Sequence, residues 1–381
     1  MADWSGNPFQ LRRDDFDDWL NQPVPTASSD PRIEVRRALP TEFERIYDLV
    51  DEAFGFKRSR ALSDWLYRHN PRGLARCWIS VERATGKIVG SAVNWPWALA
   101  RGTLALPAAQ GGDAVVAKGW QKQGIHDQAG RIRESHPWIR SVVNYGWPNP
   151  GSVQRVRKTD KAPRLIGSLR RRVLPLRSEP FLARRGLARP LSRVSSRLLD
   201  TLFAAWSTRA LASHFEGQVE PLRRFDASFD EVTRRCMVSD GYWSPHDSAF
   251  LNWRYFSDPE REYAAFALTT GDVPVGYGVV MLSSENALLM EFVVPPDQPT
   301  AARVLLQRLI QAAADAGCSS FAVMASPRWR YWRQLRVAGF IAVRSEIPMY
   351  VYSWRDDTPG VQHLDNWQLQ GGDLEPFCMS G

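Results

Sequence analysis

The chain has 381 residues, of which 44% are hydrophobic and 11% aromatic, so it is long enough to build two domains with full cores. No apolar run approaches the roughly 20 residues that span a bilayer, and the N-terminus lacks the pattern of a secretion signal, so we expect a cytoplasmic protein without a transmembrane segment. The four cysteines and six histidines show no paired ligand spacing, which argues against a metal site or a disulfide framework.

The net charge of +8 is concentrated in arginines between residues 170 and 197. Such a band attracts coenzyme phosphates, nucleic acid or an anionic membrane surface, and charge alone does not choose among them. Residues 1–30 and 355–381 are rich in Asp, Pro, Gly and Ser, so both ends are predicted to be arms or partly disordered. Aromatic side chains in the first arm could dock it on the domain; they are Trp4, Phe9, Phe16 and Trp19.

After the first arm, the pattern predicts a helix over residues 43–50, the sequence Trp65-x-Tyr67-x-x-x-Pro71, and a hairpin around Thr85-Gly86-Lys87. The next segment joins the apolar strand Ala114 to Ala117 to an amphipathic helix that starts near Ile125. The first turn of a helix carries unpaired N–H groups and partial positive charge, and Gly124 permits close approach to the main chain. The segment therefore predicts a pyrophosphate site, with an ordinary strand-turn-helix junction as the alternative.

The same order of elements returns 188 residues later, where Trp253-x-Tyr255-x-x-x-Pro259 follows a predicted helix and precedes a hairpin around Thr270-Gly271-Asp272. Each half continues with a strand, an amphipathic helix, another strand and a final strand-like segment, residues 165–176 in the first half and 340–352 in the second. We infer two copies of one α+β fold. The leucines and arginines of residues 181–214 favour a helical connector over a membrane-surface helix.

The spacing Gln121-x-x-Gly124-x-His126 resembles the coenzyme A signature of the GNAT acyltransferase superfamily, although His126 stands where that family has a small residue. The order of elements is also similar to the GNAT fold, in which a mixed sheet splays open and acyl-CoA enters the gap. The resemblance implies an α+β chain of two tandem GNAT-like folds, with acetyl-CoA or another acyl-CoA as cofactor. The implied regions are an arm (1–30), a first GNAT-like domain (31–178), a linker (179–218), a second GNAT-like domain (219–354) and a tail (355–381).

The resemblance also implies roles for particular residues. The cofactor-binding residues it implies are Val115, Val116, Ala117, Gln121, Lys122, Gln123, Gly124, Ile125, His126 and Asn149. GNAT enzymes often place a carboxylate before the loop and a proton-donating tyrosine in the helix over residues 152–158. Asp113 holds the first position, with a solvated strand-end residue as the alternative, but that helix has no tyrosine and Tyr145 is the nearest substitute. His126 is a candidate base that equally suits a helix cap or a phosphate contact.

In the second half, the position of the phosphate loop has no glycine, three prolines that remove N–H donors, and Asp297, which repels phosphate. We therefore predict that this copy does not bind coenzyme A in the usual way. Glu291 matches Asp113 in order along the chain. It either faces a shared cleft and binds a cationic acceptor, or is a structural remnant.

The sequence therefore favours transfer of an acyl group to a primary amine of a small molecule, such as an aminosugar or an amino acid derivative. A second hypothesis is a GNAT-fold binding or scaffold protein without activity, because His126 is unusual and the helix tyrosine is missing. A third is contact with nucleic acid or a membrane surface through the arginine band, although no base-reading motif is recognisable.

Overall fold

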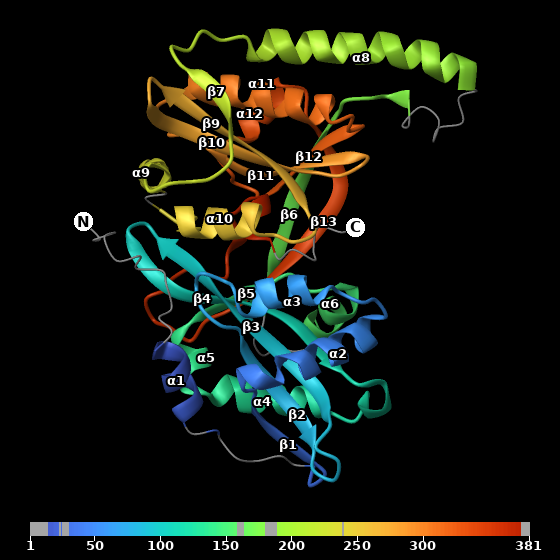
Figure 1. The fold of residues 1–381 in the computed structure, drawn as a ribbon, viewed down its shortest axis with the longest axis vertical. Helices are drawn as coiled ribbons and strands as arrows, with labels where there is room; N and C mark the ends of the chain where they lie inside the picture. Colours follow the sequence, from blue (N-terminus) through green and yellow to red (C-terminus); the bar gives the residue numbers. More distant parts are fainter. Residues whose placement is uncertain are drawn as a thin grey trace.

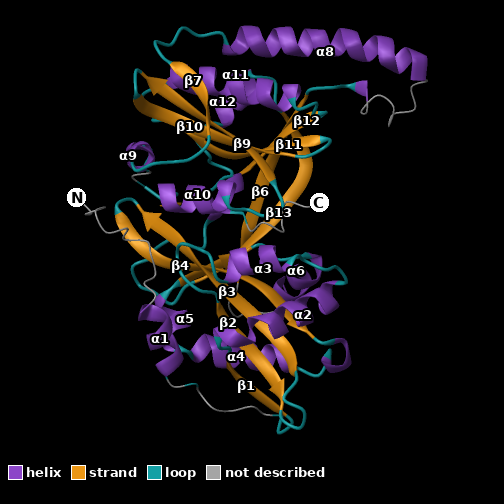
Figure 2. Ribbon diagram, in the orientation of Figure 1, coloured by secondary structure: helices purple, strands orange, loops and turns teal. Residues whose placement is uncertain are grey.

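The computed structural model describes residues 14–22, 24, 30–157, 164–179, 189–237 and 240–374. Two halves, each built of strands covered by helices, share one continuous sheet (Figures 1 and 2). The strand order of its main path is β1-β2-β3-β4-β5-β13-β6-β12-β11-β10-β9-β7. The α+β class and the repeated order of elements predicted from the sequence are confirmed.

The helices and strands of the first half are α1 (Asp14–Asn21), β1 (Ile33–Arg37), α2 (Phe43–Phe54), α3 (Arg60–Tyr67), β2 (Arg76–Glu82), β3 (Ile88–Arg101), β4 (Leu104–Val116), α4 (Ile125–Ser135), α5 (Pro137–Ser141), β5 (Val143–Gly146), α6 (Pro150–Arg157) and β6 (Arg164–Pro175). Gly86 closes the predicted hairpin between β2 and β3 with φ of +67°, a conformation that glycine adopts without strain. The predicted strand before the loop is the end of a much longer strand, β4.

The second half follows the long helix α8 (Arg189–Leu211). Its elements are β7 (Gln218–Leu222), α9 (Ser228–Arg235), β8 (Tyr242–Trp243), α10 (Ser248–Phe256), β9 (Glu262–Thr270), β10 (Val273–Leu282), β11 (Asn286–Val293), α11 (Pro299–Asp315), β12 (Ser320–Ala325), α12 (Trp332–Val337), β13 (Ile341–Tyr352), β14 (Trp367–Gln368) and the 3₁₀ turn η5 (Gly371–Asp373). The connector is helical, as predicted, and α8 lies over α11 and α12 at one end of the molecule (Figure 1).

The final strands of the two halves exchange places. β6 belongs to the first half of the sequence but lies between β12 and β13, antiparallel to both. β13 in turn pairs with β5 of the first half, so that Tyr350 lies opposite Gly146. The sheet is therefore not interrupted at the predicted domain boundary near residue 178, because each half is completed by a strand of the other.

A pair of tryptophans marks the junction of the halves. Trp65 of α3 and Trp253 of α10 stack with ring centroids 4.5 Å apart. Each indole N–H donates to the backbone carbonyl of the other tryptophan, at 3.0 and 3.1 Å. These residues are the first positions of the repeated Trp-x-Tyr pattern, so the repeat in the sequence corresponds to a local two-fold relation in space.

Both ends of the chain contribute buried residues. Phe16 and Trp19 of α1 pack into the core, which confirms docking for this part of the first arm; Trp4 and Phe9 lie outside the described residues. The expectation that residues 355–381 form an arm or are partly disordered is wrong for residues 355–374, the part that the structure describes. Trp367, Leu369 and Leu374 are buried in the core, because this segment enters the second half.

Three negative findings concern the described residues. None of their helices has the length and hydrophobicity needed to cross a bilayer. No group of three or more His, Cys, Asp and Glu side chains in the described segments is arranged to hold a metal ion. Cys77, Cys236 and Cys318 are free thiols, and Cys378 lies beyond the last described residue.

Candidate functional site

Asp113 lies in a β-bulge near the end of β4, and not at the start of a strand as predicted. The register between β3 and β4 shifts beside it, and its φ is +43°. Arg58 donates to the two carboxylate oxygens at 2.7 and 2.8 Å, and the Tyr67 hydroxyl donates at 2.7 Å. All three side chains are buried. Arg58 and Tyr67 thus engage both carboxylate oxygens, so this geometry argues against Asp113 as a catalytic base.

The second half repeats this arrangement with different residues. Glu291 of β11 contacts His246 and accepts a hydrogen bond of 2.5 Å from Tyr255. His246 and Tyr255 stand 188 positions after Arg58 and Tyr67. His246 directly precedes Asp247, which caps α10, and Arg58 directly precedes Ser59, which caps α3. Neither Arg58 nor Tyr67 was assigned to a site from the sequence, although Tyr67 belongs to the repeated Trp-x-Tyr pattern and the 188-residue offset relates both residues to the second half.

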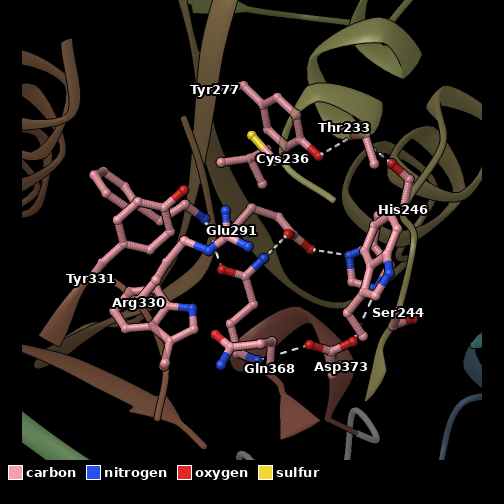
Figure 3. A pocket seen from close by; sticks show the side chains of 15 residues that line it. Thr233, Cys236, Ser244, His246, Tyr277, Glu291, Arg330, Tyr331, Gln368 and Asp373 are labelled. Carbon is pink, nitrogen blue, oxygen red and sulfur yellow. Dashed lines mark hydrogen bonds and ion pairs between the residues drawn. The ribbon is translucent and has the colours of Figure 1, made fainter. Parts of the chain in front are cut away.

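His246 lies in the wall of a cavity of about 70 Å³ in the second half (Figure 3). Its Nδ1 is 2.7 Å from Glu291 Oε1, and its Nε2 is 3.3 Å from an oxygen of Asp373. Burial opposes the charged imidazolium, but the two carboxylates outweigh burial and raise the pKa of His246 to about 9. Gln370 donates to the other Glu291 oxygen at 2.5 Å. Because both oxygens are engaged, the structure favours the structural interpretation of Glu291.

The predicted phosphate loop is a turn between β4 and α4. Gly124 caps α4 with φ of +76°, and a side chain at this position would meet open space. Gln121, Lys122 and Gln123 are exposed, whereas His126 is half-buried beside a small cavity between α4 and the sheet. The Gln121 side chain donates to the Val116 carbonyl at 3.2 Å. The predicted strand-loop-helix junction is therefore present, and the loop residues 121–124 before α4 are exposed.

The edge of β4 beside this loop is open over its last residues. β5 pairs with β4 in parallel only as far as Gln110 and Tyr145. β4 continues to Val116, and among the described residues no strand pairs with this last part on the β5 side. An open strand edge offers N–H and C=O groups to an extended ligand that contains amides. This edge leads to the first turn of α4.

In the second half, the chain itself covers the corresponding edge. β11 and β12 pair only as far as Leu289 and Val323, and the C-terminal segment then enters the gap. Phe292 N–H donates to the Gln370 side chain, and Ser326 exchanges hydrogen bonds with Leu369. The loop after β11 contains the prolines noted in the sequence, and α11 begins at Pro299.

Tyr145 and Asn149 have structural partners. Tyr145 is buried, its hydroxyl accepts a hydrogen bond from Gln110, and burial raises its pKa well above the usual value for a phenol. Asn149 caps α6, because its side chain accepts from Ser152 N–H at 2.9 Å. The polar groups of both side chains are therefore engaged within the protein.

Tyr350 of β13 is the tyrosine that reaches the point where β4 and β5 part. Its hydroxyl donates to the Gly111 carbonyl at 3.2 Å. A Cβ on Gly111 would overlap this hydroxyl, and a Cβ on Gly146 would lie 2.6 Å from it. Only glycines leave room for the phenol here. Sequence reasoning missed Tyr350 because it arrives from 239 residues away through strand exchange.

The sequence matches no protein-family model and no curated protein sequence. Solved structures do match: a GCN5-related N-acetyltransferase from Anabaena variabilis covers 85% of this chain and 73% of its own, with a TM-score of 0.60 and 10% identity. A second, from Kribbella flavida, gives a TM-score of 0.56 at 16% identity over 84% of this chain and 71% of its own. The chain has the GNAT fold.

A third solved structure matches this chain over a larger share of both proteins. The N-myristoyltransferase of Saccharomyces cerevisiae, determined with bound myristoyl-CoA, gives a TM-score of 0.52 at 10% identity and covers 87% of this chain and 85% of its own. The GNAT resemblance drawn from the sequence is therefore confirmed at the level of the fold.

Proposed function

We propose that the chain is an acyl-CoA-dependent N-acyltransferase whose first half holds the cofactor. The observation that carries this proposal is the contrast between the two halves. The last residues of β4 present an open edge beside the start of α4, whereas the chain's own C-terminal segment covers the matching edge of β11. The GNAT fold supports it, since the similar structures include N-acetyltransferases and an N-myristoyltransferase that holds myristoyl-CoA.

The residues at the loop fit an acyl-CoA molecule. The N–H groups of the first turn of α4 and the exposed Lys122 suit the pyrophosphate, and Gly124 leaves open space for its approach. The edge formed by residues 115–117 suits the pantetheine amides. Bound acyl-CoA would supply an activated thioester, whose sulfur must be protonated as it leaves.

Tyr350 is the proposed proton donor for the site of the first half. Its hydroxyl is fixed by Gly111 at the end of the β4–β5 pairing, and it comes from a strand of the second half. Asp113 has a positioning role in this proposal, because Arg58 and Tyr67 hold the bulge of β4 through its carboxylate. The second half thus completes the site without binding acyl-CoA itself.

The acceptor in this proposal is a primary amine of a small molecule in the cytoplasm, such as an aminosugar or an amino acid derivative. In this proposal, the thioester of bound acyl-CoA lies beside the open strand edge, where the amine can attack it. The supporting comparison is again the N-acetyltransferase structures, at the level of reaction class.

The test is calorimetric titration of the purified full chain with acetyl-CoA and longer acyl-CoAs. Gly124→Asp places bulk and negative charge at the start of α4 and should weaken acyl-CoA binding at least tenfold. Gly86→Asp is the matched control, because Gly86 has a similar φ of +67° and also faces open space, but lies in the β2–β3 turn. Equal affinity of wild type and Gly124→Asp would overturn the assignment of the loop.

A GNAT-fold binding protein without activity is the second candidate, and the Arg58–Asp113 pair is the observation in its favour. The carboxylate that a GNAT enzyme would use to activate the amine is neutralised by two charge-assisted hydrogen bonds. Acyl-CoA binding without thioester cleavage across a panel of amines would establish this alternative.

A further inference from the structure

Helix α8 presents an apolar stripe to the outside of the molecule. It packs over α11 and α12 with Ser207 and Leu211 buried. Leu198, Leu202 and Trp206 follow at intervals of four residues and therefore share a face. Their exposed fractions are 64%, 57% and 63%, so this face is turned away from the core. Figure 1 shows α8 as the outermost element at its end of the molecule.

The stripe continues onto the neighbouring elements. The Trp206 indole N–H donates to the carbonyl of Val337 at 3.3 Å, and Gly339 lies beside the indole ring. Val337 and Ile341 are also exposed. We call the set of Leu198, Leu202, Trp206, Val337 and Ile341 the α8 patch. It contains five of the eleven exposed large hydrophobic residues of the described chain, so these residues are concentrated and not scattered.

The charges close to the α8 patch along the chain are mostly positive. Exposed arginines stand close to its members along the chain: Arg209, Arg333, Arg336 and Arg344. No acidic residue occurs between Trp332 and Arg344, and residues 164–214 contain eleven arginines against two acids. One of these acids, Asp200, accepts a hydrogen bond from the backbone of Ser178 at 2.7 Å.

We propose that the α8 patch docks on the surface of an anionic lipid bilayer. Leucine and tryptophan side chains favour the boundary between headgroups and acyl chains, while arginines bind lipid phosphates. A second copy of the chain fits less well, because two such surfaces would bring like charges together. Nucleic acid would use the arginines but gains nothing from the apolar stripe. This surface is separate from the proposed acyl-CoA site, so the inference does not depend on the activity.

The test is co-sedimentation of the purified full chain with vesicles of phosphatidylcholine alone or with 30% phosphatidylserine. We expect binding to the anionic vesicles that falls steeply with added salt, and at least tenfold weaker partitioning for Leu198→Asp/Leu202→Asp. The control is Val273→Asp, which places a charge at an equally exposed apolar residue at the start of β10 and should bind like wild type. Circular dichroism of each variant checks that it is folded.

Four results would overturn the proposal. The first is no preference of the wild type for anionic vesicles, and the second is equal partitioning of the double variant and wild type. The third is a dimer, detected by light scattering without lipid, that the double variant disperses, since the patch would then serve a second copy. Binding to duplex DNA that matches vesicle binding in strength and ignores the leucine substitutions would assign the arginines to nucleic acid instead.

Discussion

Tyr350 is held by its neighbours in a position that suits proton transfer. Its hydroxyl lies between two glycines and donates to the Gly111 carbonyl. Tyr350→Phe removes only this oxygen. If Tyr350 is the proton donor, kcat should fall by about 10²-fold or more, while the affinity for acyl-CoA changes less than twofold. Steady-state kinetics with calorimetry on the same preparation measures both quantities.

The matched control for this prediction is Tyr352→Phe. Tyr352 lies two residues further along β13, on the same face, and its ring stacks on that of Tyr350. It should retain kcat within about threefold, because its hydroxyl does not lie at Gly111. Equal losses in the two variants would mean that the tyrosines act through packing, and an unchanged kcat in Tyr350→Phe would leave the proton donor elsewhere while the acyltransferase proposal stands.

His246 gives the chain a specific dependence of stability on pH. Its folded pKa of about 9 lies above its ordinary value of 6.5, so its contribution is fully present below pH 6.5 and is lost as the pH rises through 9. This shift corresponds to a contribution of about 3 kcal/mol. Urea unfolding should therefore show the wild type losing free energy of unfolding between pH 6.5 and 9.5.

His246→Gln tests the origin of this effect. The variant should be less stable at neutral pH, and its free energy of unfolding should change much less over the same pH range. His363→Gln replaces an exposed histidine and should keep the slope of the wild type. If His246→Gln shows the wild-type slope as well, the charge of this imidazolium does not stabilise the fold.

The residues found by sequence reasoning are those whose partners are close along the chain. The turn from Gln121 to His126 follows from local spacing of glycine and apolar residues, and the structure has the expected junction there. Tyr350 and Asp373 reach the first half from far away, and Asp373 contacts Gln110 across 263 positions. Local periodicity contains no information about such pairings, so the site could be predicted only in part.

At the scale of elements, the C-terminal segment acts as an internal strand partner for the second half. Gly372 contacts Glu291 and Tyr255 so closely that a Cβ would overlap the carboxylate. Because both neighbours are buried and hydrogen-bonded, Gly372→Ala should destabilise the fold by about 1–3 kcal/mol, as overpacking does. The change in the urea midpoint measures this effect.

Gly130→Ala is the control for Gly372→Ala. Gly130 lies within α4, and a Cβ there would meet nothing within 4 Å. Alanine should therefore leave stability unchanged or raise it by up to about 1 kcal/mol. A Gly372→Ala variant as stable as wild type would show that η5 does not pack tightly in solution.

The pattern of the sequence predicted the elements better than their connections. The repeated order of helix, hairpin, strand and helix is local information, and both halves show it. The exchange of β6 and β13 is different, because an alternation of period two predicts which face of a strand is buried but not which strand it pairs with. Geometry decides: β6 pairs with β12 and β13, and this pairing leads Tyr350 to the first half.

At the scale of the whole molecule, strand exchange makes the two halves one folding unit. A chain divided after Ser213, in the segment between α8 and β7, keeps every strand but separates β6 from β12 and β13. Fragments 1–213 and 214–381 should copurify in equal amounts when expressed together. Fragment 214–381 alone should lack cooperative thermal unfolding, because the inner edges of β12 and β13 would have no partner.

A substitution on β6 distinguishes strand exchange from nonspecific association of the fragments. Leu169 is buried on β6 and lies opposite Ile347 of β13, so Leu169→Asp in the first fragment should prevent copurification. Arg170→Asp changes a neighbouring exposed residue and should allow it. Two fragments that each unfold cooperatively and remain apart on mixing would contradict the prediction, because each half would then complete its sheet without the strand of the other.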